Sequence, residues 1–279
     1  LVWTKGKSTS LWRARRPGKR EVLEKRKHEK VEMAENNIFI GGFHAVKTAL
    51  SKASADCLEV WIKRDINSPA VEEIRVLLSN LGLKVQSASA SNLDKMYGDD
   101  HHQGIVLKRR LPATVSIEEL LDRCNTKTET ALILILDSIQ DPRNFGACLR
   151  IADGAGVDGV IYPKDNSARL GSVLAKAASG AIDTVPLVPV SNLSSAIVKV
   201  QKAGIWVTGA CSDDAAPLYS LDFSGPTAIV MGNEGSGLRR LTKERCDYLA
   251  SIPMHGALGS LNVSAATSIF LFEIKRQQS

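Results

Sequence analysis

Residues 229–238 read I-V-M-G-N-E-G-S-G-L, which predicts a buried apolar strand followed by a loop with three glycines. Two other stretches have a similar arrangement: residues 137–150 read D-S-I-Q-D-P-R-N-F-G-A-C-L-R, and residues 252–264 read I-P-M-H-G-A-L-G-S-L-N-V-S. In open α/β sheets, ligands bind at loops that follow the carboxyl ends of strands, and glycine allows the backbone to approach a ligand closely. Three such loops predict one pocket.

The second half of the chain predicts an α/β fold with a mostly parallel sheet. Near-continuous apolar strands alternate with helical stretches, the pattern of a sheet covered on both faces. The strands are expected at 131–136, 159–162, 184–188, 205–208, 228–231 and 249–252. A last helix at 262–277 carries apolar residues on more than one face, which indicates burial against a partner chain.

The first half predicts a smaller α/β module at 37–110. Helices are expected at 44–52 and 70–80, and strands at 58–62, 83–87 and 104–108. Residues 111–128, a short amphipathic helix and a polar run, are predicted to link this module to a domain at 129–279.

The adjacent residues His101 and His102 are the module's one candidate for a metal site. Adjacent side chains project to different faces of regular structure, and no carboxylate or cysteine partner stands at ligand spacing in the sequence. We therefore expect a solvated loop or an RNA contact here, and no metal in the protein.

The net charge of +6 comes from residues 1–35, which hold eleven Lys or Arg residues and five Glu residues. Residues 1–36 are predicted to be a basic, disordered arm. Such an arm can neutralise phosphates and release counterions, as nucleic-acid-binding proteins do. A solubilising tail, an added sequence and a targeting remnant are the alternatives.

The five cysteines form no C-x-x-C pair and no apolar run approaches about 20 residues, so we expect reduced thiols, no membrane span and a cytoplasmic location.

The sequence lacks the motifs that are typical of several enzyme classes. Gly232, Gly235 and Gly237 give G-x-x-G-x-G, the reverse of the dinucleotide-binding order, and G-K-[ST], G-x-S-x-G and H-E-x-x-H are absent. The dehydrogenase, nucleoside triphosphatase, hydrolase and zinc-protease readings are therefore rejected. The polar side chains that remain at the predicted pocket suit positioning chemistry without a nucleophilic cysteine: Asn144, Arg150, Glu234, Ser260 and Asn262.

The three stretches resemble, in order, the motifs of the SpoU (TrmH) branch of the SPOUT RNA methyltransferases. The matching patterns are D-P-x-N-x-G-x-x-x-R, M-G-x-E-G-x-G and I-P-M…S-L-N-V-S. From about residue 38 onward, including G-G-F-H-A-V and H-H-Q-G-I-V, the chain is most similar to members that methylate guanosine in large-subunit rRNA. The resemblance implies S-adenosylmethionine as cofactor, a C-terminal deep trefoil knot, an L30e-like RNA-binding domain at 37–110, and a homodimer whose subunits share active sites. Sequence rules alone would reject a knot, because knots are almost absent from proteins.

The resemblance also implies a set of cofactor-binding residues. Gly232, Ile252 and Leu261 are expected to offer backbone groups to the adenosine part. The remaining members of the predicted cofactor site are Met231, Asn233, Gly235, Met254, Ser260 and Asn262. Asn262 can also cap the last helix, and capping and ligand contact are compatible at a helix N-terminus.

The resemblance also implies three catalytic residues, Asn144, Arg150 and Glu234. A guanidinium has a pKa above about 12 and is a poor general base, so we expect Arg150 to bind the target phosphate. An ion pair of Arg150 with Asp141 or Asp153 is the structural alternative. Glu234 is expected to accept a hydrogen bond from the substrate or to orient Asn144.

The expected function is transfer of a methyl group from S-adenosylmethionine to the ribose 2′-hydroxyl of a guanosine in 23S rRNA. A tRNA 2′-O-methyltransferase is an alternative, because the catalytic motifs do not select the RNA. A catalytically silent RNA-binding or ribosome-assembly factor is another, and the presence of Asn144, Arg150 and Glu234 together argues against it.

Overall fold

The fold is described from a computed structural model that covers residues 37–126, 130–212, 215–257 and 259–279. The predicted arm at 1–36 lies outside these described residues. Within them, every helix is too short or too polar to cross a lipid bilayer.

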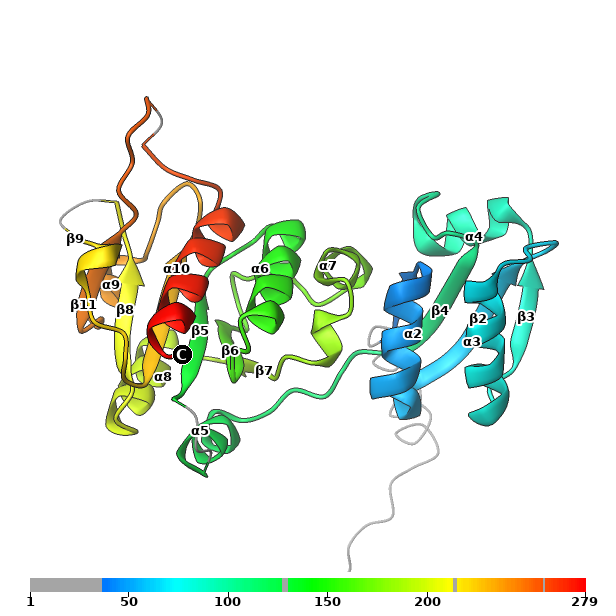
Figure 1. The fold of residues 1–279 in the computed structure, drawn as a ribbon, viewed down its shortest axis with the longest axis horizontal. Helices are drawn as coiled ribbons and strands as arrows, with labels where there is room; N and C mark the ends of the chain where they lie inside the picture. Colours follow the sequence, from blue (N-terminus) through cyan, green and yellow to red (C-terminus); the bar gives the residue numbers. More distant parts are fainter. Residues whose placement is uncertain (1–36, 127–129, 213–214, 258) are drawn as a thin grey trace, which may run out of the picture. The chain divides into compact units, whose positions relative to one another are not determined.

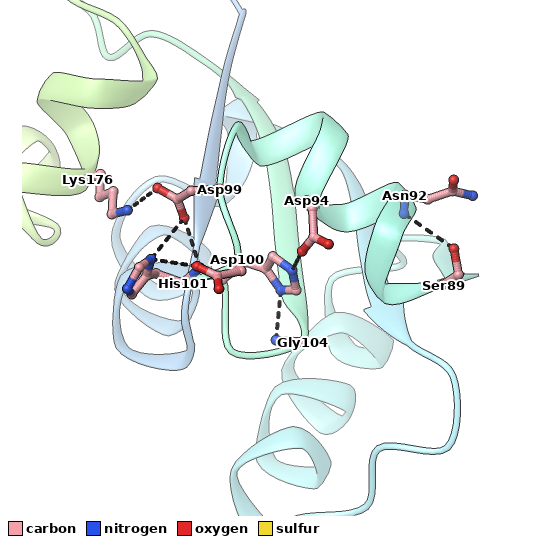
Figure 2. Close-up of polar contacts among 9 residues, drawn as sticks. Ser89, Asn92, Asp94, Asp99, Asp100, His101, Gly104 and Lys176 are labelled. Carbon is pink, nitrogen blue, oxygen red and sulfur yellow. Dashed lines mark hydrogen bonds and ion pairs between the residues drawn. The ribbon is translucent and has the colours of Figure 1, made fainter.

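The first module is a four-stranded sheet with the strand order β1-β4-β2-β3. Its strands are β1 (Asn37–Gly41), β2 (Cys57–Lys63), β3 (Val85–Ala88) and β4 (Ile105–Arg110), and its helices are α2 (Phe43–Lys52), α3 (Pro69–Asn80) and α4 (Ala90–Tyr97). The sequence predicted all of these except β1 and α4. The start of α4 has a clear signal, since the Ser89 side chain accepts a hydrogen bond from the Asn92 backbone N–H at 3.3 Å (Figure 2).

The second sheet has seven strands in the order β7-β6-β5-β10-β8-β11-β9, and every neighbouring pair is parallel (Figure 1). The strands are β5 (Leu132–Asp137), β6 (Gly159–Pro163), β7 (Leu187–Val190), β8 (Trp206–Ala210), β9 (Ala216–Pro217), β10 (Thr227–Gly232) and β11 (Tyr248–Ser251). The prediction of an α/β fold with a mostly parallel sheet is confirmed.

Two details of that sheet differ from the prediction. The strand expected at 184–188 starts later, at Leu187, because Ala181–Asp183 forms a 3-10 helix and Pro186 precedes the strand. The two-residue strand β9 was not predicted, since two residues are too few to show an alternating pattern.

Helices cover both faces of this sheet (Figure 1). Along β5, Leu132, Leu134 and Leu136 belong to one core cluster, whereas Ile133 and Ile135 belong to the other. The first cluster includes residues of α6 (Pro142–Gly154), α7 (Ser172–Ala178) and α10 (Val263–Gln277). The second includes residues of α5 (Ile117–Thr126) and α8 (Leu193–Lys202). The segment predicted as a linker thus contains α5, whose apolar face is buried on the sheet.

The strand order creates a switch point between β5 and β10. The chain moves outward from β5 through β6 to β7, then crosses to β8 and later returns to place β10 beside β5. In open α/β sheets the crevice outside the carboxyl ends of the strands at such a point is the usual ligand site. Asp137 and Gly232 lie opposite each other at these two strand ends.

Candidate active site

A cavity of about 470 Å³ opens at the carboxyl ends of β8, β10 and β11. Its volume lies within the range of roughly 300–1,000 Å³ typical of small-molecule sites. Eight of the nine residues predicted to bind the cofactor line it: Met231, Gly232, Asn233, Gly235, Ile252, Met254, Ser260 and Leu261. Asn262, the ninth, contacts the lining residue Glu234.

The 233–237 loop is a tight turn that packs against the end of its own strand. Asn233 and Gly237 exchange backbone hydrogen bonds of 3.0 and 2.8 Å. A Cβ atom at Gly232 would lie 2.3 Å from the Gly237 carbonyl carbon, far inside the normal contact distance. Gly237 has a φ of +64°, which favours glycine. Glycine is therefore required at 232 by the closeness of the loop backbone.

A second part of the cavity lining is apolar and exposed. Met254 and Leu261 are 37% and 39% exposed, although both side chains are large and hydrophobic, and Ile252 lies beside them in the lining. A flat heterocycle such as adenine needs an apolar slot together with hydrogen-bonding groups at its edge. The exposed apolar side chains and the adjacent loop backbone meet both needs, so these residues fit the adenosine part of a nucleoside cofactor.

Asn144, Glu234 and Asn262 form a hydrogen-bonded cluster that joins all three loops. Glu234 Oε1 accepts from Asn144 Nδ2 at 2.7 Å and from Asn262 Nδ2 at 2.6 Å, and Asn262 Nδ2 also donates to Asn144 Oδ1 at 3.1 Å. Asn262 Oδ1 meanwhile accepts from the Ser264 backbone N–H at 2.9 Å and caps α10. Asn262 therefore both caps the helix and contacts the site residues. The expected contact between Glu234 and Asn144 is present.

Arg150 lies apart from this cluster. It is exposed on α6, six residues after Asn144 on the same helix. Six residues of α-helix correspond to a rise of roughly 9 Å and a rotation of about 120°, so Arg150 and Asn144 stand on different sides of α6. It does not line the cavity.

The alternative for Arg150, an ion pair with Asp141 or Asp153, was wrong. Asp141 caps α6 by accepting from the Arg143 N–H at 2.9 Å, and Asp153 accepts from the Thr184 hydroxyl at 2.5 Å. Across the part of the chain that the structure describes, Arg150 has no ion-pair partner.

Cys148, within the first motif, is fully buried on α6 and lies 3.5 Å from the Thr267 hydroxyl of α10. Burial raises the pKa of its thiol to about 11, so the thiol is protonated at neutral pH. Cys211, which the sequence did not single out, lines the cavity directly after β8. Its position at a strand end was the available signal.

The two adjacent histidines face different surroundings, as expected. His102 is buried, with Nε2 2.8 Å from Asp94 Oδ1 and Nδ1 accepting from the Gly104 N–H at 2.9 Å. His101 is exposed, and its Nδ1 lies 2.9 Å from Asp100. The prediction that no carboxylate partner stands at ligand spacing was therefore wrong, because Asp94 lies beside the ring of His102 and Asp100 beside that of His101.

Asp99, Asp100 and His101 place one potential ligand atom each within 4.8 Å of one another (Figure 2). However, Lys176 already donates a hydrogen bond to Asp99 and lowers the pKa of that carboxyl group. The side chains of Asp100 and His101 are 83% and 76% exposed. The group is a surface ion-pair cluster.

Comparison with known sequences decides the family. The SpoU rRNA Methylase family matches residues 131–272, and a domain described as RNA 2'-O ribose methyltransferase substrate binding matches residues 39–113. The chain belongs to the SpoU rRNA methylase family. Its relatives include the 23S rRNA (guanosine-2'-O-)-methyltransferase RlmB of Shewanella oneidensis, which is 43% identical over 86% of this chain and 97% of that protein. The RlmB protein of Pseudomonas aeruginosa is 42% identical over 85% of this chain and 96% of its own length.

Solved structures share the fold of this SpoU methylase. The SpoU methyltransferase AviRb from Streptomyces viridochromogenes, crystallised with AdoMet, gives a TM-score of 0.71 at 24% identity and covers 88% of this chain and 92% of its own. An AdoMet-bound rRNA methyltransferase from Sinorhizobium meliloti gives 0.73 at 24% identity, over 92% of this chain and 93% of its own. Both likenesses extend across the two α/β parts of the chain.

Proposed function

We propose that this protein transfers a methyl group from S-adenosylmethionine to the ribose 2′-hydroxyl of a guanosine in 23S rRNA. The observation that carries the proposal is the meeting of Asn144, Glu234 and Asn262, one from each motif, beside a cavity that suits adenosine. The names of the 42–43% identical RlmB relatives supply the RNA and the nucleoside. Because that substrate is ribosomal RNA, we place the protein in the cytoplasm.

The cavity residues would hold the cofactor through backbone groups and apolar contacts. The adenine ring would lie against Met254, Leu261 and Ile252, and the loop backbone at Gly232 and Gly235 would supply hydrogen bonds at its edge. When bound, S-adenosylmethionine supplies a methyl group on a positively charged sulfur. Asn233, Ser260 and Asn262 are the polar side chains of this proposed cofactor site.

Glu234 is proposed to receive a hydrogen bond from the ribose hydroxyl. Its Oε1 already accepts from Asn144 and Asn262, which fixes the orientation of the carboxylate. Among the described residues nothing donates to Oε2, which leaves this oxygen available to an external donor. The network would therefore set the direction of the attacking oxygen, a positioning role that can supply a large part of catalysis.

Arg150 is proposed to bind the target phosphate with its guanidinium, which remains charged at all physiological pH values. The proton of the hydroxyl would pass to that phosphate or to water. Because Arg150 lies outside the cavity of its own chain, we propose that it serves the site of a second subunit.

A homodimer formed through α6 and α10 would bring these parts together. The two helices pack on each other, and Phe272 of α10 is 50% exposed close to Gly154 of α6. Light scattering at micromolar concentration should give the mass of a dimer, and Phe272→Glu should give a monomer with a folded circular dichroism spectrum. A monomeric unsubstituted protein would refute the dimer proposal.

Two further features are proposed from the family resemblance. We propose that the C-terminal part of the chain forms the trefoil knot, since α10, which follows β11 in the sequence, packs against β10 and α6. We also propose that residues 37–110 are an L30e-like RNA-binding domain, followed by a linker at 111–128 and the methyltransferase domain at 129–279. The substrate-binding match at residues 39–113 supports the RNA-binding role.

The test is a methylation assay with tritiated S-adenosylmethionine on 23S rRNA and on total tRNA, both taken from cells that lack this gene. Mass spectrometry would then map each new ribose methyl group. The proposal expects a single methylated guanosine in 23S rRNA. Labelling of tRNA alone would favour the tRNA enzyme, and no labelling of any RNA would favour the silent RNA-binding protein.

A further inference from the structure

Asp137 is a fully buried carboxylate at the end of β5, and the catalytic network does not use it. Its Oδ1 accepts from Arg239 Nε at 2.6 Å and from the Ser138 hydroxyl at 3.1 Å. Its Oδ2 accepts from the Arg239 backbone N–H at 3.1 Å. A buried charge costs free energy unless it is paired and hydrogen-bonded, and Arg239 supplies two of these three donors.

Arg239 stands directly after the loop that carries Glu234. That loop starts at Gly232, which lies opposite Asp137 in the β5–β10 pairing, so Asp137 marks the strand end where the loop begins. Arg239 attaches the far end of the loop to the same carboxylate. The Asn233 side chain adds a third attachment by donating to the Ser138 carbonyl at 3.1 Å and accepting from the Gly235 N–H at 3.0 Å.

We infer that Asp137 and Arg239 form a clamp that holds the 232–239 loop in the conformation in which Glu234 reaches Asn144 and Asn262. Arg239 and Asp137 are then positioning residues for the methyl transfer, acting through Glu234 and the loop backbone of the cofactor cavity. The inference rests on the proposed function of that cavity.

The neighbouring residue gives a matched control. Arg240 is next in sequence, its side chain is 78% exposed, and it pairs on the surface with Glu244 at 2.6 Å. Removing Arg240 deletes the same charge from the same segment and leaves Asp137 untouched. The ion pair of Arg239 differs from that of Arg240 because its carboxylate partner, Asp137, has no access to water.

The experiment compares Arg239→Ala, Arg239→Lys and Asp137→Asn with Arg240→Ala in the full-length protein. Calorimetry measures binding of S-adenosylhomocysteine, and steady-state assays give kcat and the KM for S-adenosylmethionine. Arg239→Ala should raise the Kd about ten-fold or more and lower kcat at saturating cofactor, because a charge-assisted contact is lost. Arg239→Lys should fall between, since it keeps the charge but loses the Nε contact. Arg240→Ala should stay within about two-fold of the unsubstituted protein.

Hydrogen exchange separates the clamp from the proposed function, because it needs neither cofactor nor RNA. Amides of the 232–239 peptide should exchange faster in Arg239→Ala and in Asp137→Asn, and remain as protected in Arg240→Ala as in the unsubstituted protein. Equal exchange and equal Kd in Arg239→Ala and Arg240→Ala would overturn the clamp. If the unsubstituted protein fails to bind S-adenosylhomocysteine, the proposed function is refuted, while the exchange comparison still decides the clamp. If Arg239→Ala fails to fold, Arg239→Lys and Asp137→Asn supply the comparison.

Discussion

The same parallel strands β8, β10 and β11 carry a cavity at each end. The cavity at their carboxyl ends has a volume of about 470 Å³, and the one at their amino ends about 430 Å³. The amino-end cavity is lined by the first residue of each strand, Trp206, Thr227 and Tyr248, with the two aromatic rings 5.7 Å apart. In volume the two cavities are close to equal.

Their polar groups are organised differently. At the carboxyl ends, one carboxylate oxygen of Glu234 receives hydrogen bonds from two other loops. At the amino ends, the carboxylate of Asp222 accepts from Ser224, its own near neighbour in sequence. The two ends of this sheet therefore differ in the convergence of distant loops on one atom, and not in the volume of the cavity.

The largest effect is expected from a comparison of two substitutions, one that removes the Glu234 carboxylate at the carboxyl ends of the strands and one that removes the Asp222 carboxylate at their amino ends. Glu234→Ala should lower kcat about 1,000-fold, because the amides of Asn144 and Asn262 lose their common acceptor at the reacting centre. Asp222→Ala, at the other cavity, should leave kcat within about two-fold. Methylation assays on 23S rRNA make the comparison, and equal losses in the two variants would remove the distinction between the two ends.

Replacing Arg150 tests whether the site at the carboxyl ends of the strands is completed by a residue of a second subunit. Arg150→Ala should lower kcat about 100-fold and leave the Kd for S-adenosylhomocysteine within a few-fold, because the side chain lies outside the cavity. If Arg150 serves a second subunit, mixing and refolding Arg150→Ala with Glu234→Ala should restore about a quarter of full activity through mixed dimers. No recovery would place Arg150 in the site of its own chain.

Glycine substitutions test the packing at each end. Gly232→Ala should raise the Kd for S-adenosylhomocysteine about 30-fold, because the new Cβ would meet the Gly237 backbone at 2.3 Å. Gly225→Ala is the matched change at the other cavity, where an added Cβ meets nothing within 4 Å. Its Kd should not change. Tight binding by Gly232→Ala would show that the loop can move away without loss.

The smallest effect concerns cysteine reactivity. Cys211 lines the carboxyl-end cavity, so S-adenosylhomocysteine should slow its alkylation about ten-fold at about pH 7.5. Burial raises the pKa of Cys148 to about 11 and that of Cys246 to about 12, which leaves less than about one thiolate in 1,000 at that pH. Both should stay unmodified with or without the ligand, as read by peptide mass spectrometry. Unchanged alkylation of Cys211 would argue against ligand binding in that cavity.

The parallel sheet could be predicted because its signals are local, whereas the lining of the cavity was implied by the resemblance to the SpoU family. A strand followed by glycines is visible within ten residues: Gly232 ends β10 and Ile252 directly follows β11, whereas Leu261 lies just before α10. Of the contacts between distant segments, the family resemblance implied the one between Asn144 and Glu234, whereas the others carry no signal in the sequence. Asp137 and Arg239 are 102 positions apart, and neither carries a pattern that indicates the other. Asp94 likewise reaches His102 only because α4, a helix the sequence did not predict, carries it there.

The most direct test of the account is a crystal structure of this protein with S-adenosylhomocysteine. The account predicts the adenosine against Gly232, Ile252 and Leu261, with the sulfur directed toward the cluster of Asn144, Glu234 and Asn262. Density for the ligand in the amino-end cavity beside Trp206 and Tyr248, or a 232–239 loop displaced from Asp137 in the complex, would contradict it.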